Sequence, residues 1–177
     1  MEHELIEITW VIAISVIIAT STTVIFNFLL TRTARNQNKI SKKHIEYLGM
    51  LEIMRYFNDP RIAKERDIII RANRTNSLYD EVGGFQGEDQ GVMVASVRGT
   101  FDQMGKLVLD KYVNEKQFYN MYADSVIVMY KILKKHIDTE RTKRKSDFLA
   151  HNFESIFKEA KVYWKTNYPN EPEPEPF

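Results

Sequence analysis

A stretch without formal charge near the start of this chain limits what it can fold into more than any other feature does. Residues 8–31 carry no charge, whereas acidic residues precede them and basic residues follow them. As an α-helix the stretch would be roughly 36 Å long, enough to cross a hydrocarbon core of about 30 Å. The sequence therefore predicts a transmembrane helix over residues 8–31, preceded by a short extracytoplasmic tail of residues 1–7.

Two other interpretations of the stretch fit less well. A signal peptide has a basic start, an apolar run of about 7 to 15 residues and a cleavage site after that run. This chain starts with acidic residues, and its small pair Ala13 and Ser15 falls inside the run. A buried helix of a soluble protein would show a charged face within a few turns. Residues 8–31 have no such face, so we expect a membrane span.

The flanking charges predict the orientation of this span. Basic residues close to a span are retained on the cytoplasmic side, and the juxtamembrane segment of residues 32–43 is basic. We therefore expect a single-pass protein of the cell membrane, with its N-terminus outside and its C-terminal domain in the cytoplasm. The absence of cysteine fits a reducing compartment. Anionic lipid is an expected partner of the juxtamembrane cations, which are Arg32, Arg35, Lys39, Lys42 and Lys43.

One side of the span is predicted to contact another helix. Small or polar residues recur there every four positions, so they share one helical face: Ser15, Ala19, Thr23 and Asn27. Such residues allow a second helix to approach closely, and Asn27 could form a hydrogen bond across the contact. The alternative is that the hydroxyl groups bond back to their own helix. The stripe is a hypothesis of a homo-oligomer or of a membrane protein partner.

The rest of the chain reads as helical. Residues 44–168 show apolar and charged residues at helical spacing and almost no strand-like alternation. The predicted fold class is therefore all-α, with a single N-terminal transmembrane helix followed by a cytoplasmic up-and-down bundle of about five helices. These helices are expected at about 41–57, 60–76, 88–111 and 114–145, with a fifth that begins near Ser146 and Asp147.

Local signals predict where several helices begin and where a loop lies. Asp59 followed by Pro60 has the pattern of an N-cap and a first helical residue. Asn114 and Gln117 have the spacing of a capping box variant. Residues 83–87 include three glycines, which favour a loop, but they lack the lysine of a phosphate-binding loop.

Helical spacing also predicts which apolar residues share a face. The expected sets are Ile45, Leu48, Leu51 and Met54 in the first helix, Ile62, Ile69 and Ile70 in the second, and Met93, Val97, Phe101, Met104 and Val108 in the third. The set of the fourth helix is Phe118, Met121, Tyr122, Ser125, Met129, Ile132, Leu133 and His136. The set of the fifth is Leu149, Phe153, Ile156, Phe157, Ala160, Tyr163 and Trp164. Gly99 and Gly105 interrupt the third helix, and close packing of a neighbouring helix would compensate for them.

A second basic cluster lies at the end of the fourth helix. It consists of Lys134, Lys135, Arg141, Lys143, Arg144 and Lys145. In an up-and-down bundle this end returns to the membrane, where the cluster could join the juxtamembrane cations on anionic lipid. The alternative is an ordinary solvated face. Nucleic acid is not an expected partner, because 25 basic residues are balanced by 24 acidic ones and no groove-reading motif is present.

After Pro169 the chain alternates glutamate and proline. Proline supplies no backbone donor, and neighbouring glutamates repel one another. We therefore expect residues 169–177 to form an extended, disordered Glu-Pro tail.

Four motifs carry a resemblance to a known family. They are V-R-x-x-F-D-x-M-G-x-L-V over residues 97–108, V-N-E-x-x-F over 113–118, Y-A-D-S-V over 122–126 and N-F-E over 152–154. In these residues the chain resembles a family of uncharacterised prokaryotic domains, mostly helical and often preceded by one N-terminal transmembrane span. The resemblance implies a helical fold, and it implies no activity.

No catalytic, cofactor or metal motif is found in the sequence. A helical di-metal site needs Glu-x-x-His twice, and the chain has only the reverse order, at His151 and Glu154. Asp102 and Asp124 could be polar groups at a helix seam, although paired carboxylates are the simpler interpretation.

We expect no enzyme, no cofactor and no metal. The predicted function is a membrane-anchored interaction module or accessory subunit of a membrane complex. The alternative is a membrane-bound ligand sensor or enzyme with a site inside the bundle.

Overall fold

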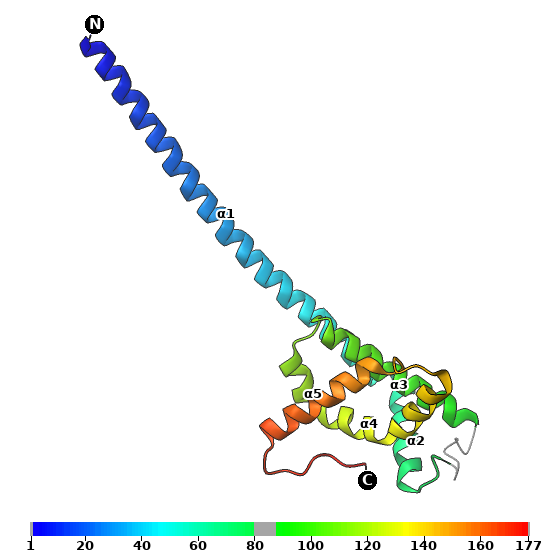
Figure 1. Cartoon of the computed structure of the whole chain (residues 1–177). Helices are drawn as coiled ribbons and strands as arrows, with labels where there is room; N and C mark the ends of the chain where they lie inside the picture. The colour runs from blue at the N-terminus through cyan, green and yellow to red at the C-terminus, as the bar shows by residue number, and fades with distance from the viewer. Residues whose placement is uncertain (1, 80–87, 177) are drawn as a thin grey trace. The chain divides into compact units, whose positions relative to one another are not determined.

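The computed structural model describes the backbone of residues 2–79 and 88–176, and the side chains of these residues except 2–9, 11–14, 17 and 18. Over these ranges the chain forms five helices and no strand, which confirms the all-helical prediction (Figure 1). The predicted loop at residues 83–87 lies outside the described residues. The helices are α1 (Glu2–Asn58), α2 (Pro60–Arg74), α3 (Glu88–Leu109), α4 (Glu115–Arg144) and α5 (His151–Asn167). The chain divides into two compact units, Met1–His44 and Ile45–Phe177.

The predicted transmembrane helix is wrong. Among the residues that the structure describes, no helix is both long enough and apolar enough to cross a membrane. The single-pass localisation, with its outside N-terminus and cytoplasmic domain, is therefore also overturned. Absence of charge is not the same as apolarity, because hydroxyl and amide groups lower the hydropathy of a helix. Such groups recur through residues 20–31, at Thr20, Ser21, Thr22, Thr23, Asn27 and Thr31.

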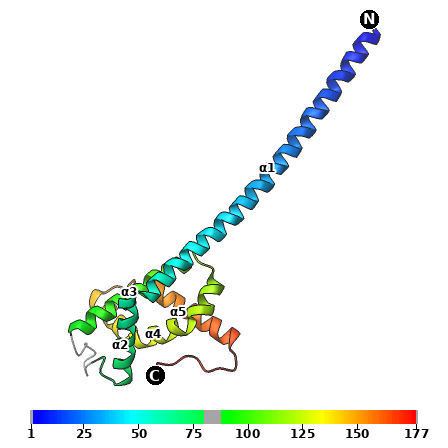
Figure 2. The same ribbon diagram turned by 180° about the vertical axis from the view of Figure 1, so that it is seen from behind.

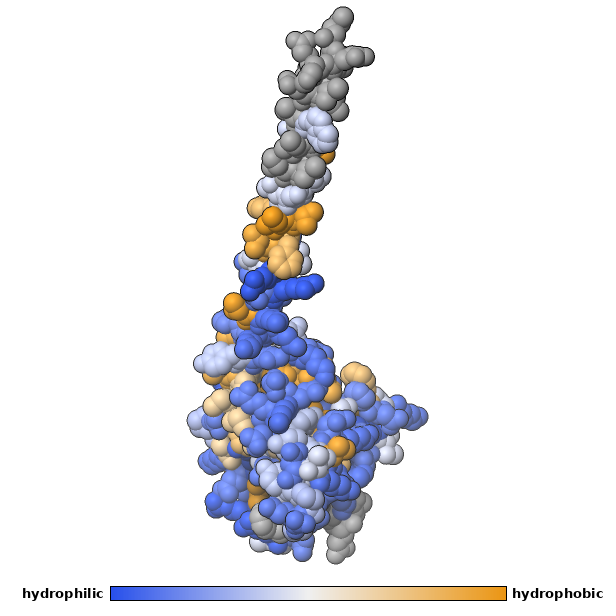
Figure 3. Space-filling model, turned by 90° about the vertical axis from the view of Figure 1, so that its left-hand side faces the viewer, coloured by the Kyte–Doolittle hydropathy of each residue, from blue (hydrophilic) through white to orange (hydrophobic). Residues whose placement is uncertain are grey.

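In the first unit, α1 satisfies several polar side chains within its own turns. The hydroxyl of Thr23 donates to the carbonyl of Ala19 at 2.9 Å, and that of Thr31 donates to the carbonyl of Asn27 at 2.8 Å. This is the back-bonding alternative weighed for the small-residue stripe. Large apolar side chains between these threonines are all more than half exposed, and they form the orange band of α1 in Figure 3: Val24, Ile25, Phe26, Phe28, Leu29 and Leu30.

Two of the predicted helix starts are confirmed. The carboxylate of Asp59 accepts hydrogen bonds from the backbone N–H groups of Arg61 at 2.9 Å and Ile62 at 3.1 Å, and Pro60 is the first residue of α2. The side chain of Asn114 accepts the N–H of Gln117 at 3.1 Å and caps α4. These caps form within a few residues, so local sequence is enough to predict them.

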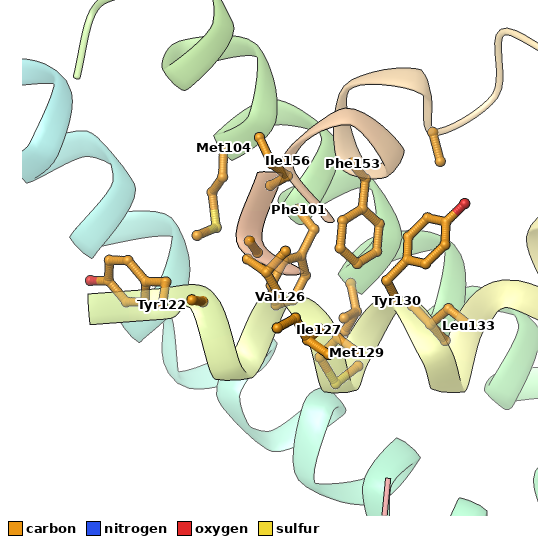
Figure 4. Packing of buried hydrophobic residues seen from close by; sticks show 14 of the residues in the cluster. Phe101, Met104, Tyr122, Val126, Ile127, Met129, Tyr130, Leu133, Phe153 and Ile156 are labelled. Carbon is orange, nitrogen blue, oxygen red and sulfur yellow. The ribbon is translucent and has the colours of Figure 1, made fainter. Parts of the chain in front are cut away.

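The core of the second unit is centred on α3, which contacts α2, α4 and α5. The rings of Phe101 on α3 and Phe153 on α5 stack with their centroids 4.8 Å apart, and Tyr130 of α4 packs edge-on against Phe153 at 5.2 Å (Figure 4). Most residues predicted on the inner faces of α2 to α5 are buried here. Several others, such as Phe157, Tyr163 and Trp164, are half-buried against the core, whereas Met121 is 45% exposed.

The part of α1 that belongs to the second unit buries a different face from the predicted apolar set. Met50 and Ile53 are buried in the core, and Gly49 faces the backbone carbonyl of Tyr112 so closely that a Cβ atom would clash with it. Because this approach needs a glycine, it determines which face of α1 turns inward. The predicted set, Ile45, Leu48, Leu51 and Met54, is 38% to 50% exposed.

The helix α5 begins at His151, four residues later than Asp147. Its N-cap residue, Ala150, has a φ of 56° and makes no side-chain capping bond. The cap comes from α3 instead, because the carboxylate of Asp102 accepts the backbone N–H of Phe153 at 3.0 Å and the side-chain amide of Asn152 at 3.3 Å. The close approach predicted at Gly105 is confirmed, since a Cβ there would lie 2.6 Å from the carbonyl oxygen of Asn152. At Gly99 nothing lies within 4 Å of such a Cβ, so that prediction is wrong.

Candidate functional site

A buried polar contact joins α3 to α4. A guanidinium nitrogen of Arg98 lies 3.2 Å from Nε2 of His136. Burial of the ring, followed by the charge of Arg98, lowers the pKa of His136 to about 4. The imidazole is therefore neutral at pH 7 and accepts a hydrogen bond from the guanidinium. A neutral histidine held in this way links two helices and cannot act as a general acid at that pH.

A second polar contact joins α4 to α5. Arg141 makes an ion pair with Glu154 at 2.8 Å and donates from Nε to the carbonyl of Leu149 at 3.0 Å. Lys158 also pairs with Glu154, at 2.7 Å. The bond from Lys158 and, next, that from Arg141 lower the pKa of the Glu154 carboxyl. Together with Asp102 of α3, which caps the start of α5, these contacts position the helix.

Half of the predicted basic cluster at the end of α4 is paired within its own helix. Lys134 bonds Asp138 at 2.5 Å, while Lys143 and Arg144 reach Glu140 at 3.3 and 3.2 Å. Because each pair spans three or four positions, helix geometry alone explains it. Pairing leaves less positive charge to attract an anion. The other three members of the cluster have different surroundings. Lys135 lies 5.3 Å from the Tyr79 ring centroid, Arg141 bonds Glu154 of α5, and Lys145 is the C-cap of α4 in a left-handed conformation.

The predicted contact residues of α1 lie in the first unit and are exposed wherever their side chains are described. This holds for the small-residue stripe of Ser15, Ala19, Thr23 and Asn27 and for the cations Arg32, Arg35, Lys39, Lys42 and Lys43. The helix–helix contact predicted for the stripe stays a prediction. Within the described ranges no group of three or more histidine and acidic side chains could hold a metal ion.

The Glu-Pro segment, residues 169–177, makes specific contacts as far as it is described, which extends to Pro176. The chain turns back after α5, as both ribbon views show (Figures 1 and 2). Lys131 of α4 then bonds the carboxylates of Glu173 at 2.8 Å and Glu175 at 2.7 Å. Trp164 of α5 donates its indole N–H to the carbonyl of Pro172 at 3.1 Å. Alternating proline and glutamate predicts disorder here, and the composition of the segment gives no sign of the contacts that Lys131 and Trp164 make with it.

Two half-open hollows adjoin these elements. One, of about 250 Å³, lies between α1, α2 and α4 and is lined by Phe57, Arg66, Ile70, Asp124, Ser125, Val128 and Met129. In it the Arg66 guanidinium stacks 3.5 Å from the Phe57 ring centroid, and its buried Nη1 atom has no hydrogen-bond partner. The other hollow, of about 240 Å³, is walled by Tyr119, Trp164 and Tyr168 beside the Glu-Pro segment.

Two of the four motifs that carry the family resemblance, residues 97–108 and 152–154, meet in the fold. Asp102 and Gly105 of α3 contact the start of the N-F-E motif, at Asn152 and Phe153. The sequence matches the model of the family described as Domain of unknown function (DUF4760) over residues 9–160. The chain belongs to the DUF4760 family. No curated protein and no solved structure matches this DUF4760 chain. The matched range ends before Lys161, Trp164 and the Glu-Pro segment.

Proposed function

We propose that this DUF4760 protein is a helical interaction module that associates with a second copy of itself through α1. The observation that carries the proposal is that α1 is apolar on two opposite faces within the second unit. Met50 and Ile53 point into the core, whereas Leu48 and Leu51 are 50% and 43% exposed. A helix that is apolar on both sides is stable in water only when both sides are covered. Tyr47 and Met54 are also exposed beside them. We term the surface formed by Tyr47, Leu48, Leu51 and Met54 the outer face of α1.

The charges beside the outer face favour a second copy as its cover. Glu52 and Arg55 lie on the same side of α1 as Leu48 and Leu51, and they bond each other at 2.5 Å. Their charges cancel locally, so two copies can bring the same face together without repulsion between like charges. A contact between identical faces is the usual geometry of a symmetric dimer. The apolar band at residues 24–30 is a further exposed region of α1 that such an association could cover.

Sedimentation velocity of the full chain over a range of concentrations tests the proposal. We expect the unchanged chain to associate and Leu51→Glu to raise the dissociation constant at least tenfold, because a carboxylate would be buried in the contact. Val162→Glu is the matched control, since Val162 is an exposed aliphatic residue on α5. A chain that stays monomeric at every concentration, or a Leu51→Glu variant that associates as before, would contradict the proposal. Circular dichroism checks that both variants remain folded.

A ligand-binding role is the second candidate, and the hollow at Arg66 favours it. A buried guanidinium nitrogen without a partner could donate to a small carboxylate or phosphate. Titration of the full chain with inorganic phosphate and with acetate, followed by the unfolding temperature, tests this role. A rise that disappears in Arg66→Met would support it. An unchanged unfolding temperature at millimolar ligand would exclude these two anions.

A further inference from the structure

The contacts of the Glu-Pro segment resemble those of a bound peptide more than those of a covalent continuation of the fold. The ammonium group of Lys131 bonds two carboxylates and also donates to the carbonyl of Pro174 at 2.9 Å. Lys161 of α5 reaches the second oxygen of Glu173 at 3.3 Å. One glutamate thus lies between lysines from two helices. We term the surface formed by Lys131, Lys161 and Trp164 the Lys-Trp site.

Backbone recognition accompanies this charge pairing. Trp164 donates to the carbonyl of Pro172, and Lys131 donates to that of Pro174. The segment is rich in proline, which has no N–H group to satisfy and holds the chain extended before it binds. Donors on the protein that meet carbonyls of a proline-rich strand, beside an aromatic ring, are the recurring chemistry of proline-rich peptide recognition. Tyr168 completes the aromatic wall, with its ring centroid 4.6 Å from that of Trp164.

The carboxylate of Glu173 is held as an anion. Burial alone would raise the pKa of Glu173, but the bonds from Lys131 and Lys161 outweigh it, and the net pKa is lowered. The side chains of Lys131 and Glu173 are 20% and 21% exposed, whereas that of Glu175 is 73% exposed. The ion pair of Glu175 is accessible to water on the glutamate side and is therefore weak. The segment can therefore leave the site without disrupting the core, whose buried cluster ends at Ala160 among the described residues.

We propose that the Lys-Trp site is a recognition site for extended acidic, proline-containing segments of other proteins, and that the chain's own Glu-Pro segment occupies it as an intramolecular competitor. The site lies on α4 and α5, so the proposal does not depend on self-association through α1. The hollow of about 240 Å³ beside Trp164 and Tyr168 is left open by the chain's own segment. A partner that also places an apolar side chain there would gain contacts that the resident segment lacks.

Because the Glu-Pro segment belongs to the same chain as the Lys-Trp site, it competes strongly with any added peptide. A segment joined to α5 through the turn at Tyr168, whose carbonyl accepts the N–H of Glu171 at 3.1 Å, is present at a high effective concentration. A free peptide of the same sequence must compete with it. Removing the resident segment's charges should therefore increase the affinity for an added peptide, with no change in the site itself.

Peptide binding to the full chain tests this proposal. Glu173→Lys with Glu175→Lys places cations beside Lys131 and Lys161 and so empties the site by repulsion. A fluorescein-labelled peptide with the sequence of residues 170–177 is titrated against this variant and against the unchanged chain, with anisotropy as the readout. Trp10→Phe in all chains leaves Trp164 as the single tryptophan, because the sequence contains two. Its emission then reports binding at the Lys-Trp site.

We expect the peptide to bind the charge-reversed chain at least tenfold more tightly than the unchanged chain, with a change in Trp164 emission. Adding Lys131→Gln should weaken this binding at least tenfold, whereas Lys165→Gln, on the exposed side of α5, should leave it unchanged. Trp164→Phe keeps the ring, removes the donor and should weaken binding severalfold. A peptide with glutamine in place of each glutamate should not bind. Circular dichroism verifies the fold of each variant.

Three results would overturn the proposal. Equal affinity for the charge-reversed and unchanged chains would mean that the resident segment does not occupy the site. Absence of binding to the folded charge-reversed chain would mean that the surface is not a recognition site. Self-association of the unchanged chain that is lost on charge reversal but kept in Leu51→Glu would mean that the segment acts between copies. Failure of any of these tests leaves the result at the outer face of α1 unaffected.

Discussion

The helix α3 and the outer face of α1 carry similar apolar stripes but have opposite surroundings. On α3, Val97, Phe101 and Met104 are completely buried, because α2, α4 and α5 all contact this helix. On the outer face of α1, Leu48 and Leu51 remain about half exposed. The comparison teaches that helical spacing predicts which residues share a face. It does not predict whether another element covers that face.

The largest loss of stability should come from truncating a side chain in the covered stripe of α3. Phe101 is completely buried and stacks on Phe153. We expect Phe101→Ala to lower the free energy of unfolding by about 3–5 kcal/mol, because the lost ring leaves a cavity. Urea unfolding followed by circular dichroism measures this change. A loss below about 1 kcal/mol would mean that α3 is not the centre of the core.

The second largest effect should be a pH dependence of stability that comes from the buried His136 of α4. The pKa of His136 is lowered from 6.5 to about 4, so the unfolded chain binds the proton at a higher pH than the folded chain does. The free energy of unfolding should therefore fall as the pH drops from about 6.5 to 4, by on the order of 2–3 kcal/mol. The charged groups that act on the ring are Arg98, Glu140, Lys143 and Arg144.

The variant His136→Gln isolates this effect. Its stability should depend less on pH between 7 and 4.5 than that of the unchanged chain, when both are followed by urea unfolding. His151→Gln is the control, because His151 lies exposed at the start of α5. Equal pH dependence in the unchanged chain and His136→Gln would show that the ring is not responsible.

Two glycines of α3 make a matched pair on the same helix. A Cβ at Gly105 would lie 2.6 Å from the carbonyl oxygen of Asn152, whereas a Cβ at Gly99 would meet nothing within 4 Å. We expect Gly105→Ala to destabilise the fold by about 1–2 kcal/mol through the clash with backbone. Gly99→Ala should stabilise it by up to about 1 kcal/mol. Thermal unfolding of the two variants gives the signs, and equal signs would refute the packing of α3 on α5.

A smaller effect is expected at the cap that α3 supplies to α5. Asp102→Ala removes the acceptor for the N–H of Phe153 and should cost about 1 kcal/mol, the usual value for a lost cap. Asp110→Ala is the control, because Asp110 is exposed just after α3. Hydrogen exchange at Phe153 should accelerate in Asp102→Ala alone. Unchanged exchange there would show that the N–H has another partner.

The smallest effect is expected on the outer face of α1. Leu51→Ala should change the free energy of unfolding by less than about 0.5 kcal/mol in dilute solution, because the side chain is partly solvated there. Repeating the measurement at high concentration sharpens the comparison with Phe101. If two copies meet at this face, the loss caused by Leu51→Ala should grow with concentration. A large loss already at low concentration would mean that this chain covers the face itself.

Sequence reasoning succeeded where the deciding contacts are local. The caps at Asp59 and Asn114 depend on residues two or three positions away, and the structure confirms both. It was wrong at the start of α5, because the cap there comes from Asp102 on another helix. It also missed the Lys-Trp site. A weak signal was present in the acidic Glu-Pro repeat, but nothing in the sequence links this repeat to Lys131.

The lysines of α4 also show that sequence spacing predicts local ion pairs but not distant ones. Lys134 and Arg144 have acidic neighbours one turn away, and these ion pairs form. Spacing could have predicted them, and with them a weaker surface charge. Lys131 lies on the same helix and has its acidic partners more than forty positions later in the chain. Two lysines one turn apart on α4 thus have different roles, and only the fold distinguishes them.

By itself, the sequence determined that the described chain is helical, where most of its helices begin, and which residues of α2 to α5 turn inward, because these properties depend on neighbours within one or two turns. It also determined that residues 8–31 carry no charge, whereas no helix of the described residues is both long and apolar enough for a span. Only the tertiary structure decided which face of α1 is covered, where α5 begins and what Lys131 binds. The physical reason is that each of these depends on contacts between residues far apart in the chain.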